Sequence, residues 1–136
     1  MGIYTGVFVL LKILFWANCK MERKMKIAVD LDGTISEYPE FFRLFTKAMS
    51  QAGCKIYVVT DRPPGAEQIV SEQLKGYGIT YDVIEITGRK DTFILKEGIT
   101  VLFDDVDDYF VDLPAEVAVF KIRQKYNFDF AEKKWI

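Results

Sequence analysis

From Met25 onward, short apolar runs that suit β-strands alternate with segments whose apolar residues recur at helical spacing, and this alternation constrains the fold most strongly. Strands of five or six residues that alternate with helices imply parallel strands, with helices on both faces of the sheet. We therefore predict an α/β fold, a single Rossmann-like three-layer domain with a parallel sheet of about five strands. Polar residues at the carboxyl ends of its strands should converge, because such folds bind ligands there.

The expected elements follow one another with short connections. The first strand is expected over residues 26–32, and Gly33 allows a sharp turn directly after it. The later strands are expected at Lys55–Thr60, Tyr81–Ile86, Ile99–Phe103 and Val117–Ile122, and the helices at Pro39–Ala52, at about 63–76 and at Arg89–Glu97. The tail, residues 123–136, has a mixed pattern, and we expect its aromatic residues to pack back onto the body.

The composition excludes several classes of function. The chain has 136 residues and a net charge of -2, whereas general nucleic-acid binding favours a basic surface. It contains no histidine, which removes Ser-His and Cys-His nucleophiles and the common zinc sites. Catalysis must then use carboxylates, lysine, hydroxyls and oxygen-bound metal ions. The two cysteines, Cys19 and Cys54, have no metal-type spacing and fit a reducing, cytoplasmic compartment.

An apolar N-terminal segment, residues 1–24, precedes the predicted domain, residues 25–136. Residues 1–19 carry a single charge and approach the length of about 20 residues that a bilayer span needs. Three interpretations stay open. The segment is a membrane anchor with a positive flank, an extra element packed on the domain, or a consequence of start-site choice, because Met21 and Met25 stand just before the domain. We expect a cytoplasmic protein, with attachment to a membrane as the alternative.

Polar side chains stand at the ends of three expected strands and at the start of one helix. In chain order they are Asp30 and Asp32, Thr60, Lys90, and Asp104 and Asp105. The period of two along a strand would place Asp30 and Asp32 on the same side. Two acids at the end of an apolar strand are costly unless a divalent cation, a lysine or backbone donors compensate them. We therefore predict a phosphoryl-transfer site with Asp30 as the nucleophile.

These residues resemble four motifs of the haloacid dehalogenase superfamily of phosphohydrolases. Residues 30–34, Asp-Leu-Asp-Gly-Thr, match its first motif, Asp-x-Asp-Gly-Thr. Thr60 matches the second motif, Lys90 the third, and residues 104–105 the acidic fourth. The resemblance extends over roughly residues 25–122, and the order of the motifs separates the chain from response-regulator receivers, in which the paired acids come first.

The resemblance implies a magnesium-dependent phosphatase, that is, a phosphoric monoester hydrolase. In this interpretation Asp30 attacks phosphorus and carries an aspartyl-phosphate. Asp32 protonates the leaving oxygen and later deprotonates the attacking water. Lys90 and the hydroxyl of Thr60 bind the phosphoryl oxygens and offset the charge of the transition state.

The expected cofactor is Mg²⁺, which takes one or two carboxylates and completes its shell with waters and phosphate oxygens. Asp30 and one of Asp104 and Asp105 would supply these carboxylates. The resemblance adds the backbone carbonyl of Asp32 as a further ligand. We expect a phosphorylated substrate, which the sequence does not identify.

Several neighbours of the motif residues have open roles. Lys96 competes with Lys90, although only Lys90 stands at the start of its helix. Arg62 either contacts the substrate phosphate or faces solvent. Among the acids after the fourth strand, Asp107 is expected in an exposed loop and Asp108 close behind the site.

The spaces between the motifs hold only one helix and one strand each. Members of the family carry their specificity in cap insertions at these places, so the resemblance implies a minimal, capless member with an open site. The alternative is a non-catalytic domain of the same fold that binds a metal ion or a partner.

Overall fold

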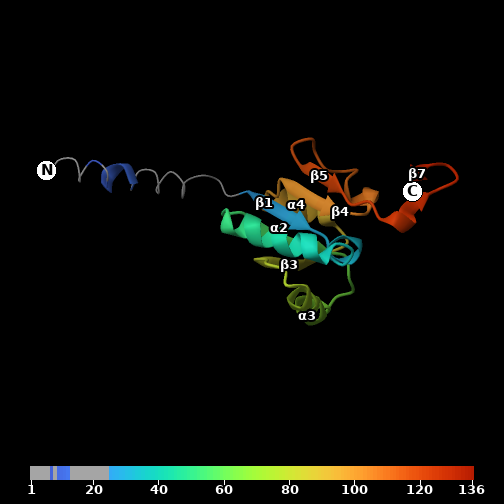
Figure 1. The fold of residues 1–136 in the computed structure, drawn as a ribbon, viewed down its shortest axis with the longest axis horizontal. Coiled ribbons are helices and arrows are strands. Elements are labelled where there is room, and N and C mark those ends of the chain that lie inside the picture. Colours follow the sequence, from blue (N-terminus) through green and yellow to red (C-terminus); the bar gives the residue numbers. More distant parts are fainter. Residues whose placement is uncertain (1–6, 8, 13–24) are drawn as a thin grey trace.

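A computed structural model describes residues 7, 9–12 and 25–136 of the chain (Figure 1). The three interpretations of residues 1–24 concern residues that lie mostly outside this described part. Within the described residues, no helix has the length and apolar character needed to cross a membrane.

Five parallel strands form the central sheet, in the order β3-β2-β1-β4-β5. They are β1 (Lys26–Val29), β2 (Lys55–Thr60), β3 (Val83–Ile86), β4 (Val101–Asp104) and β5 (Ala118–Lys121). The central strand, β1, pairs through Ile27 with Ile56 on one side and with Val101 on the other. The α/β class and the five-stranded parallel sheet predicted from the sequence are confirmed. Because the strand order reverses between β1 and β4, their carboxyl ends form the point where open α/β sheets bind ligands.

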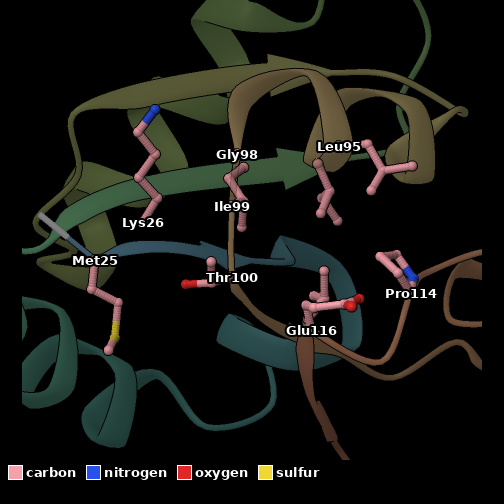
Figure 2. A pocket seen from close by; sticks show the side chains of 10 residues that line it. Met25, Lys26, Leu95, Gly98, Ile99, Thr100, Pro114 and Glu116 are labelled. Carbon is pink, nitrogen blue, oxygen red and sulfur yellow. The ribbon is translucent and has the colours of Figure 1, made fainter. Parts of the chain in front are cut away.

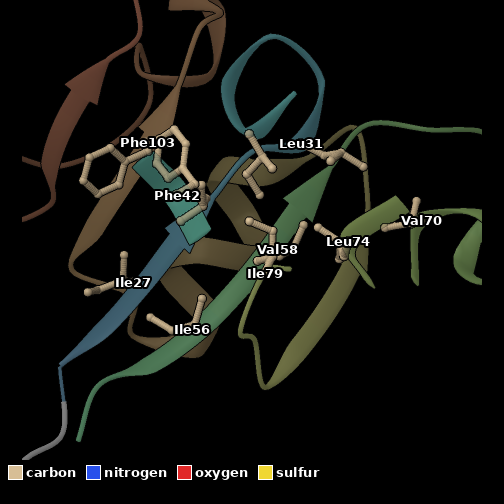
Figure 3. Close-up of a cluster of buried hydrophobic side chains, with 11 residues drawn as sticks. Ile27, Leu31, Phe42, Ile56, Val58, Val70, Leu74, Ile79 and Phe103 are labelled. Carbon is tan, nitrogen blue, oxygen red and sulfur yellow. The ribbon is translucent and has the colours of Figure 1, made fainter. Parts of the chain in front are cut away.

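Helices cover both faces of this sheet. Phe42 of α2 (Pro39–Gln51) and Leu74 of α3 (Glu67–Tyr77) pack with Ile27 and Val29, and Figure 3 shows this cluster. On the opposite face, α4 (Lys90–Glu97) packs Ile94 into a cluster with residues of β1, β2 and β4. Neighbouring strand residues enter opposite clusters because side chains alternate along a strand. Each large apolar side chain that is fully buried stabilises the fold by roughly 1.5–3 kcal/mol.

Only some of the apolar residues of helix α2 face the sheet. Phe42, Phe45 and Met49 are buried or half-buried against the sheet, at the spacing of one helical face. Phe41 and Leu44, which share the apolar pattern in the sequence, are 55% and 60% exposed. A rotation of about 100° per residue carries these two side chains off the buried stripe.

The first strand is shorter than the sequence indicates. Strand β1 ends at Val29, and Leu31–Ile35 forms a tight helical turn, termed η1, whose Gly33 has φ +80°. The prediction that Asp30 and Asp32 share one side of a strand is therefore wrong. Asp30 is buried at the start of the turn and Asp32 is exposed within it. The turn closes through backbone bonds such as Ser36 N–H to the Leu31 carbonyl at 3.0 Å, which replace strand pairing.

Most other boundaries differ from the predictions by one or two residues. Helix α3 is an exception and begins at Glu67, about four residues later than expected, because residues 63–66 form the preceding loop, whose two prolines lack amide donors. Strand β3 begins at Val83, two residues later than expected.

The tail forms a small hairpin instead of a layer on the body. A single turn, η3 (Lys125–Asn127), leads into β6 (Phe128–Asp129) and β7 (Lys134–Trp135), which pair antiparallel. Phe128 contacts the rings of Phe130 and Trp135 at centroid distances of 5.0 and 4.9 Å. The aromatic residues of the hairpin thus contact one another, and the deepest contact of the tail with the body is made by a polar residue, Gln124.

Candidate functional site

All but one of the predicted site residues line a single pocket at the carboxyl edge of the sheet. The pocket has a volume of about 330 Å³. Its lining residues are Asp30, Asp32, Gly33, Thr60, Asp61, Lys90, Asp105, Val106, Tyr109 and Tyr126. The remaining predicted residue, Asp104, is fully buried behind the pocket, where it contacts Lys90. The topology therefore brings together predicted residues that are up to 75 positions apart in the sequence, from Asp30 to Asp105, as the expected parallel sheet requires.

Lys90 lies between two buried carboxylates. Its Nζ donates to Asp30 Oδ1 at 2.8 Å and to Asp104 Oδ2 at 2.7 Å. Lys90, Asp30 and Asp104 are 1%, 4% and 0% exposed, so all three charges are withdrawn from water. Burial of an isolated charge costs a large desolvation free energy, and the ion pairs between Lys90 and the two carboxylates offset part of this cost.

The protonation of this cluster follows from burial and proximity. Burial lowers the pKa of Lys90, but Asp30 and Asp104 outweigh it and raise the pKa above its ordinary value. Burial raises the pKa of Asp30 to about 8, with Lys90 opposing the shift and Asp104 adding to it. Burial also raises the pKa of Asp104. One ammonium thus faces two carboxyl groups, and the cluster attracts either a proton or a further cation.

Backbone contacts fix the two carboxylates in place. The Asp30 N–H donates to the Phe103 carbonyl at 2.9 Å, which joins the ends of β1 and β4. Asp104 Oδ1 accepts from the Val106 N–H at 3.0 Å. Lys96 is exposed near the end of α4 and does not line the pocket, so position favours Lys90 in the choice between the two lysines.

Asp105 completes a group of three carboxylates that could hold a metal ion. One oxygen each from Asp30, Asp104 and Asp105 lies within 4.8 Å of the others. Among the described residues, neither the buried Asp105 Oδ1 nor the buried hydroxyl of Thr60 has a hydrogen-bond partner, and Thr60 is 1% exposed and lines the pocket. These orphaned oxygens need a donor or a cation, because a buried polar atom without a partner is costly.

The donor set fits Mg²⁺ in type and in charge. Its ligands would all be oxygens, which hard divalent cations prefer. The ionised forms of Asp30, Asp104 and Asp105 carry three negative charges, and Lys90 supplies one positive charge. A divalent cation would bring this buried group to neutrality, which no monovalent ion would do.

Asp32 is held by Arg62. The guanidinium donates from Nε to Asp32 Oδ2 at 2.8 Å and from Nη2 to Oδ1 at 2.7 Å. This hydrogen bonding lowers the pKa of Asp32, whose side chain is 57% exposed. Arg62, whose role the sequence left open, therefore keeps Asp32 ionised in this arrangement.

The lining also holds residues that were not predicted, namely Asp61, Val106, Tyr109 and Tyr126. Tyr109, and Gln124 beside the pocket, make contacts that bear on the site. Tyr109, in the short turn η2 (Asp107–Tyr109), places its ring 4.2 Å from Lys90 Nζ and donates its hydroxyl to Asp61 Oδ2 at 2.8 Å. Gln124 follows β5 and reaches the turn after β1. No motif or periodicity marks either residue, because both act through contacts between distant loops.

The other acids after β4 lie outside the site. Asp107 forms a salt bridge with Lys121 at 2.9 Å and is exposed, as expected. Asp108 is exposed and absent from the lining of the pocket, so its expected place behind the site is wrong. An exposed turn after the strand carries both residues away from the sheet edge.

A second hollow, of about 390 Å³, lies at the amino edge of the sheet (Figure 2). It is lined by Met25, Lys26, Ile94, Leu95, Gly98, Ile99, Thr100, Pro114, Glu116 and Val117. Lys26 and Glu116 are the ionisable groups among these lining residues, and its walls are largely apolar. Of these two hollows, the larger one is therefore not the one in which the acids, the lysine and the threonine hydroxyl come together.

Comparisons with known proteins find a distant likeness of fold. No family model matches the chain, and no curated protein matches it. A solved universal stress protein in complex with cAMP matches over 73% of this chain and 96% of its own length, with 13% identity and a TM-score of 0.44. A likeness this distant carries no conclusion about ligand or activity.

These findings correct the family identification made from the motifs. No family model and no curated protein supports a haloacid dehalogenase, and the solved structure named above is a universal stress protein. The physical reason is that any parallel α/β sheet brings the residues at the carboxyl ends of its strands to one edge. Short polar motifs at those positions report the chemistry of the edge and do not identify a family. We therefore set the family aside, together with the capless architecture and the carbonyl ligand that rested on it.

Proposed function

We propose that this chain is a magnesium-dependent phosphatase that acts through an aspartyl-phosphate on Asp30. The observation that supports the proposal is the buried group of Asp30, Lys90 and Asp104 beside Asp105, which opens into the pocket at the carboxyl edge of the sheet. The proposal rests on the chemistry of these side chains and on no family relationship.

The charge balance of the site explains why a cation and a phosphate would bind together. Three carboxylates and one ammonium would repel a phosphate dianion. Asp30, Asp104 and Asp105 would hold Mg²⁺, which, when bound, neutralises charge on the phosphoryl oxygens. Lys90 and the unpartnered hydroxyl of Thr60 then offer donors to the phosphoryl group.

Asp30 carries the covalent step. Its Oδ1 accepts from Lys90 at 2.8 Å, whereas Oδ2 accepts, within the described part of the chain, a longer hydrogen bond of 3.5 Å from the Thr34 hydroxyl, so Oδ2 is the freer oxygen. Oδ2 forms a bond to phosphorus, the ester P–O bond breaks, and the leaving oxygen takes up a proton. Water then attacks phosphorus and gives a proton to Asp32, which is ionised after protonating the leaving oxygen; the bond to Asp30 breaks, and inorganic phosphate is released.

Asp32 and Arg62 provide the proton transfer in this proposal. Arg62 keeps Asp32 ionised, so Asp32 acts as an acid only after Arg62 has left it. A phosphate competes for the paired donors of a guanidinium. Transfer of Arg62 to the substrate phosphate would let the pKa of Asp32 rise, so that its carboxyl group holds the proton that the leaving oxygen needs.

A second candidate function is a domain that binds a cation or a partner without catalysis. The bidentate pair between Arg62 and Asp32 favours it, because an acid locked in its ionised form donates no proton. In this alternative, the buried carboxylates bind metal and the phosphate chemistry is absent.

The experiment compares three forms of the full chain: the wild type, Asp30→Asn and Asp112→Asn. Asp112 is an exposed acid outside the pocket and serves as the matched control. Hydrolysis of an aryl phosphate is measured with Mg²⁺ and with EDTA. We expect activity that requires Mg²⁺, is unchanged in Asp112→Asn and falls by roughly 10³-fold or more in Asp30→Asn.

A covalent intermediate gives an independent readout. Acid-quenched protein should carry phosphate that hydroxylamine releases, and Asp30→Asn should carry none. Hydrolysis that survives Asp30→Asn would refute the proposal. Binding of Mg²⁺ with no turnover of a panel of phosphate esters would instead support the non-catalytic alternative.

A further inference from the structure

Gln124 is a fully buried polar residue in an otherwise exposed stretch of chain. It is 0% exposed, whereas its neighbours Arg123 and Lys125 are exposed. Burial of an amide costs free energy unless its polar atoms find partners. The contacts that Gln124 makes must therefore offset this cost.

The Gln124 side chain joins the two loops that carry the acids of the site. Its Nε2 donates to the carbonyl of Gly33, in the turn after β1, and lies 3.4 Å from Asp105 Oδ2, in the loop after β4. The contacts span 91 and 19 positions of sequence. Its Oε1 is buried and has no hydrogen-bond partner within residues 25–136, so the two contacts of Nε2 orient the amide.

These contacts set which oxygen of Asp105 is free. Oδ2 faces the Gln124 amide, while Oδ1 is buried without a partner. The backbone carbonyl of Asp105 also accepts from Lys121 Nζ, so Asp105 is held from the side of β5 at two places. A Cβ on Gly33 would overlap the Asp105 carboxylate and the Gln124 amide, which shows how closely the three groups pack.

We propose that Gln124 is a positioning residue, which orients Asp105 so that Oδ1 is presented together with Asp30 and Asp104 for cation binding. The inference rests on the cation site of the proposed function, but not on catalysis. Removing a side chain that orients a metal ligand typically weakens metal affinity 10- to 100-fold. The segment after β5 would thus complete a site whose ligands all come from earlier elements.

The test measures cation affinity directly in the full-length chain. Binding of Mn²⁺ is followed by electron paramagnetic resonance, and Mg²⁺ affinity is obtained by competition. Gln124→Met keeps the length of the side chain and removes the donor, and Gln73→Met, on the exposed surface of α3, is the matched control. We expect 10- to 100-fold weaker binding in Gln124→Met and no change in Gln73→Met.

A double-mutant cycle separates positioning from general loss of structure. If Gln124 acts through Asp105, Gln124→Met adds little to the affinity lost in Asp105→Asn. Where hydrolysis is measurable, excess Mg²⁺ should restore the rate of Gln124→Met, which a misfolded site would not allow. If Gln124→Met does not fold, Gln124→Asn shortens the same amide by one methylene and should show a smaller loss in the same direction.

The failures of the two proposals differ in their readouts. A wild type that binds Mn²⁺ but hydrolyses no phosphate ester would refute the phosphatase and leave the Gln124 inference standing. Equal affinity in Gln124→Met and Gln73→Met, additive effects in the cycle, or no cation binding by the wild type would overturn it.

Discussion

Replacement of Lys90 by Met tests the buried charge cluster without any assumption about function. Met has a similar length and no charge, so the change removes the ammonium and leaves the cavity nearly filled. Asp30 and Asp104 would then be two buried carboxyl groups without a cation between them. Lys96→Met, at an exposed position of the same helix, is the matched control.

The expected loss of stability follows from the contacts of Lys90. It makes two charge-assisted hydrogen bonds, each contributing about 1.5–3 kcal/mol. Their sum agrees with the loss of about 3–5 kcal/mol that usually follows removal of one partner from a buried ion pair. Because a domain of this size has about 5–15 kcal/mol of unfolding free energy, Lys90→Met should lose a large part of it.

The loss should depend on pH in a defined direction. Burial raises the pKa of Asp30 from 3.8 to about 8, so the folded state holds a proton that the unfolded chain releases between these values. The unfolding free energy therefore falls as the pH rises from about 4 to about 8. Without Lys90, the pKa of Asp30 and that of Asp104 rise further. The deficit of Lys90→Met should thus be larger at pH 8 than at pH 5.

Urea denaturation followed by circular dichroism, in buffer with EDTA, measures these differences. Lys96→Met should stay within about 0.5 kcal/mol of the wild type. If Lys90→Met does not fold, the variant Asp30→Asn/Lys90→Met/Asp104→Asn should fold, because it removes all three buried charges together. Equal stability of Lys90→Met and Lys96→Met, or a deficit that shrinks as the pH rises, would refute this account of the cluster.

Two further predictions concern the turn after β1. Gly33→Ala should destabilise the protein well beyond Gly65→Ala. Both glycines have positive φ, a conformation that costs an alanine about 1 kcal/mol. Of the two, Gly33 is the position where the new Cβ would overlap other side chains. Urea denaturation of both variants measures this, and equal losses would contradict the packing described for Gly33. Arg62→Met should raise the pKa of Asp32 toward its ordinary value while changing stability by at most about 1 kcal/mol, because the Asp32 side chain is 57% exposed and water screens the pair. NMR titration of the carboxyl carbon checks this, and an unchanged pKa of Asp32 would show that Arg62 does not hold it in solution.

Much of the candidate site could be predicted from the sequence because its residues end strands or begin a helix. Asp30, Thr60 and Asp104 were expected at strand ends, and the structure places them there or one residue beyond. Lys90 was expected at the start of a helix and is the first residue of α4. In a parallel sheet such positions lie at the same edge whatever the details of packing, so the local sequence pattern was sufficient to predict that these residues come together.

The rest depended on contacts that leave no local pattern. The period of two along a strand placed Asp32 on the same side as Asp30. Strand β1 ends at Val29, however, and the backbone hydrogen bonds of the following turn orient Asp32 toward solvent and Arg62. Gln124 looked like one polar residue in a mixed tail. Its burial is decided by the turn after β1, about 90 residues away, which no window of neighbouring residues contains.

The sequence by itself determined the class of the fold, the parallel sheet and the edge at which the acids, the hydroxyl and the lysine gather. It did so because alternating strands and helices have few ways to bury their apolar faces. The tertiary structure alone decided which charges are buried, which carboxyl oxygens are free, and that Gln124 and Arg62 each hold one acid of the site. Those properties depend on distances between loops from separate strands, and such distances exist only once the sheet has formed.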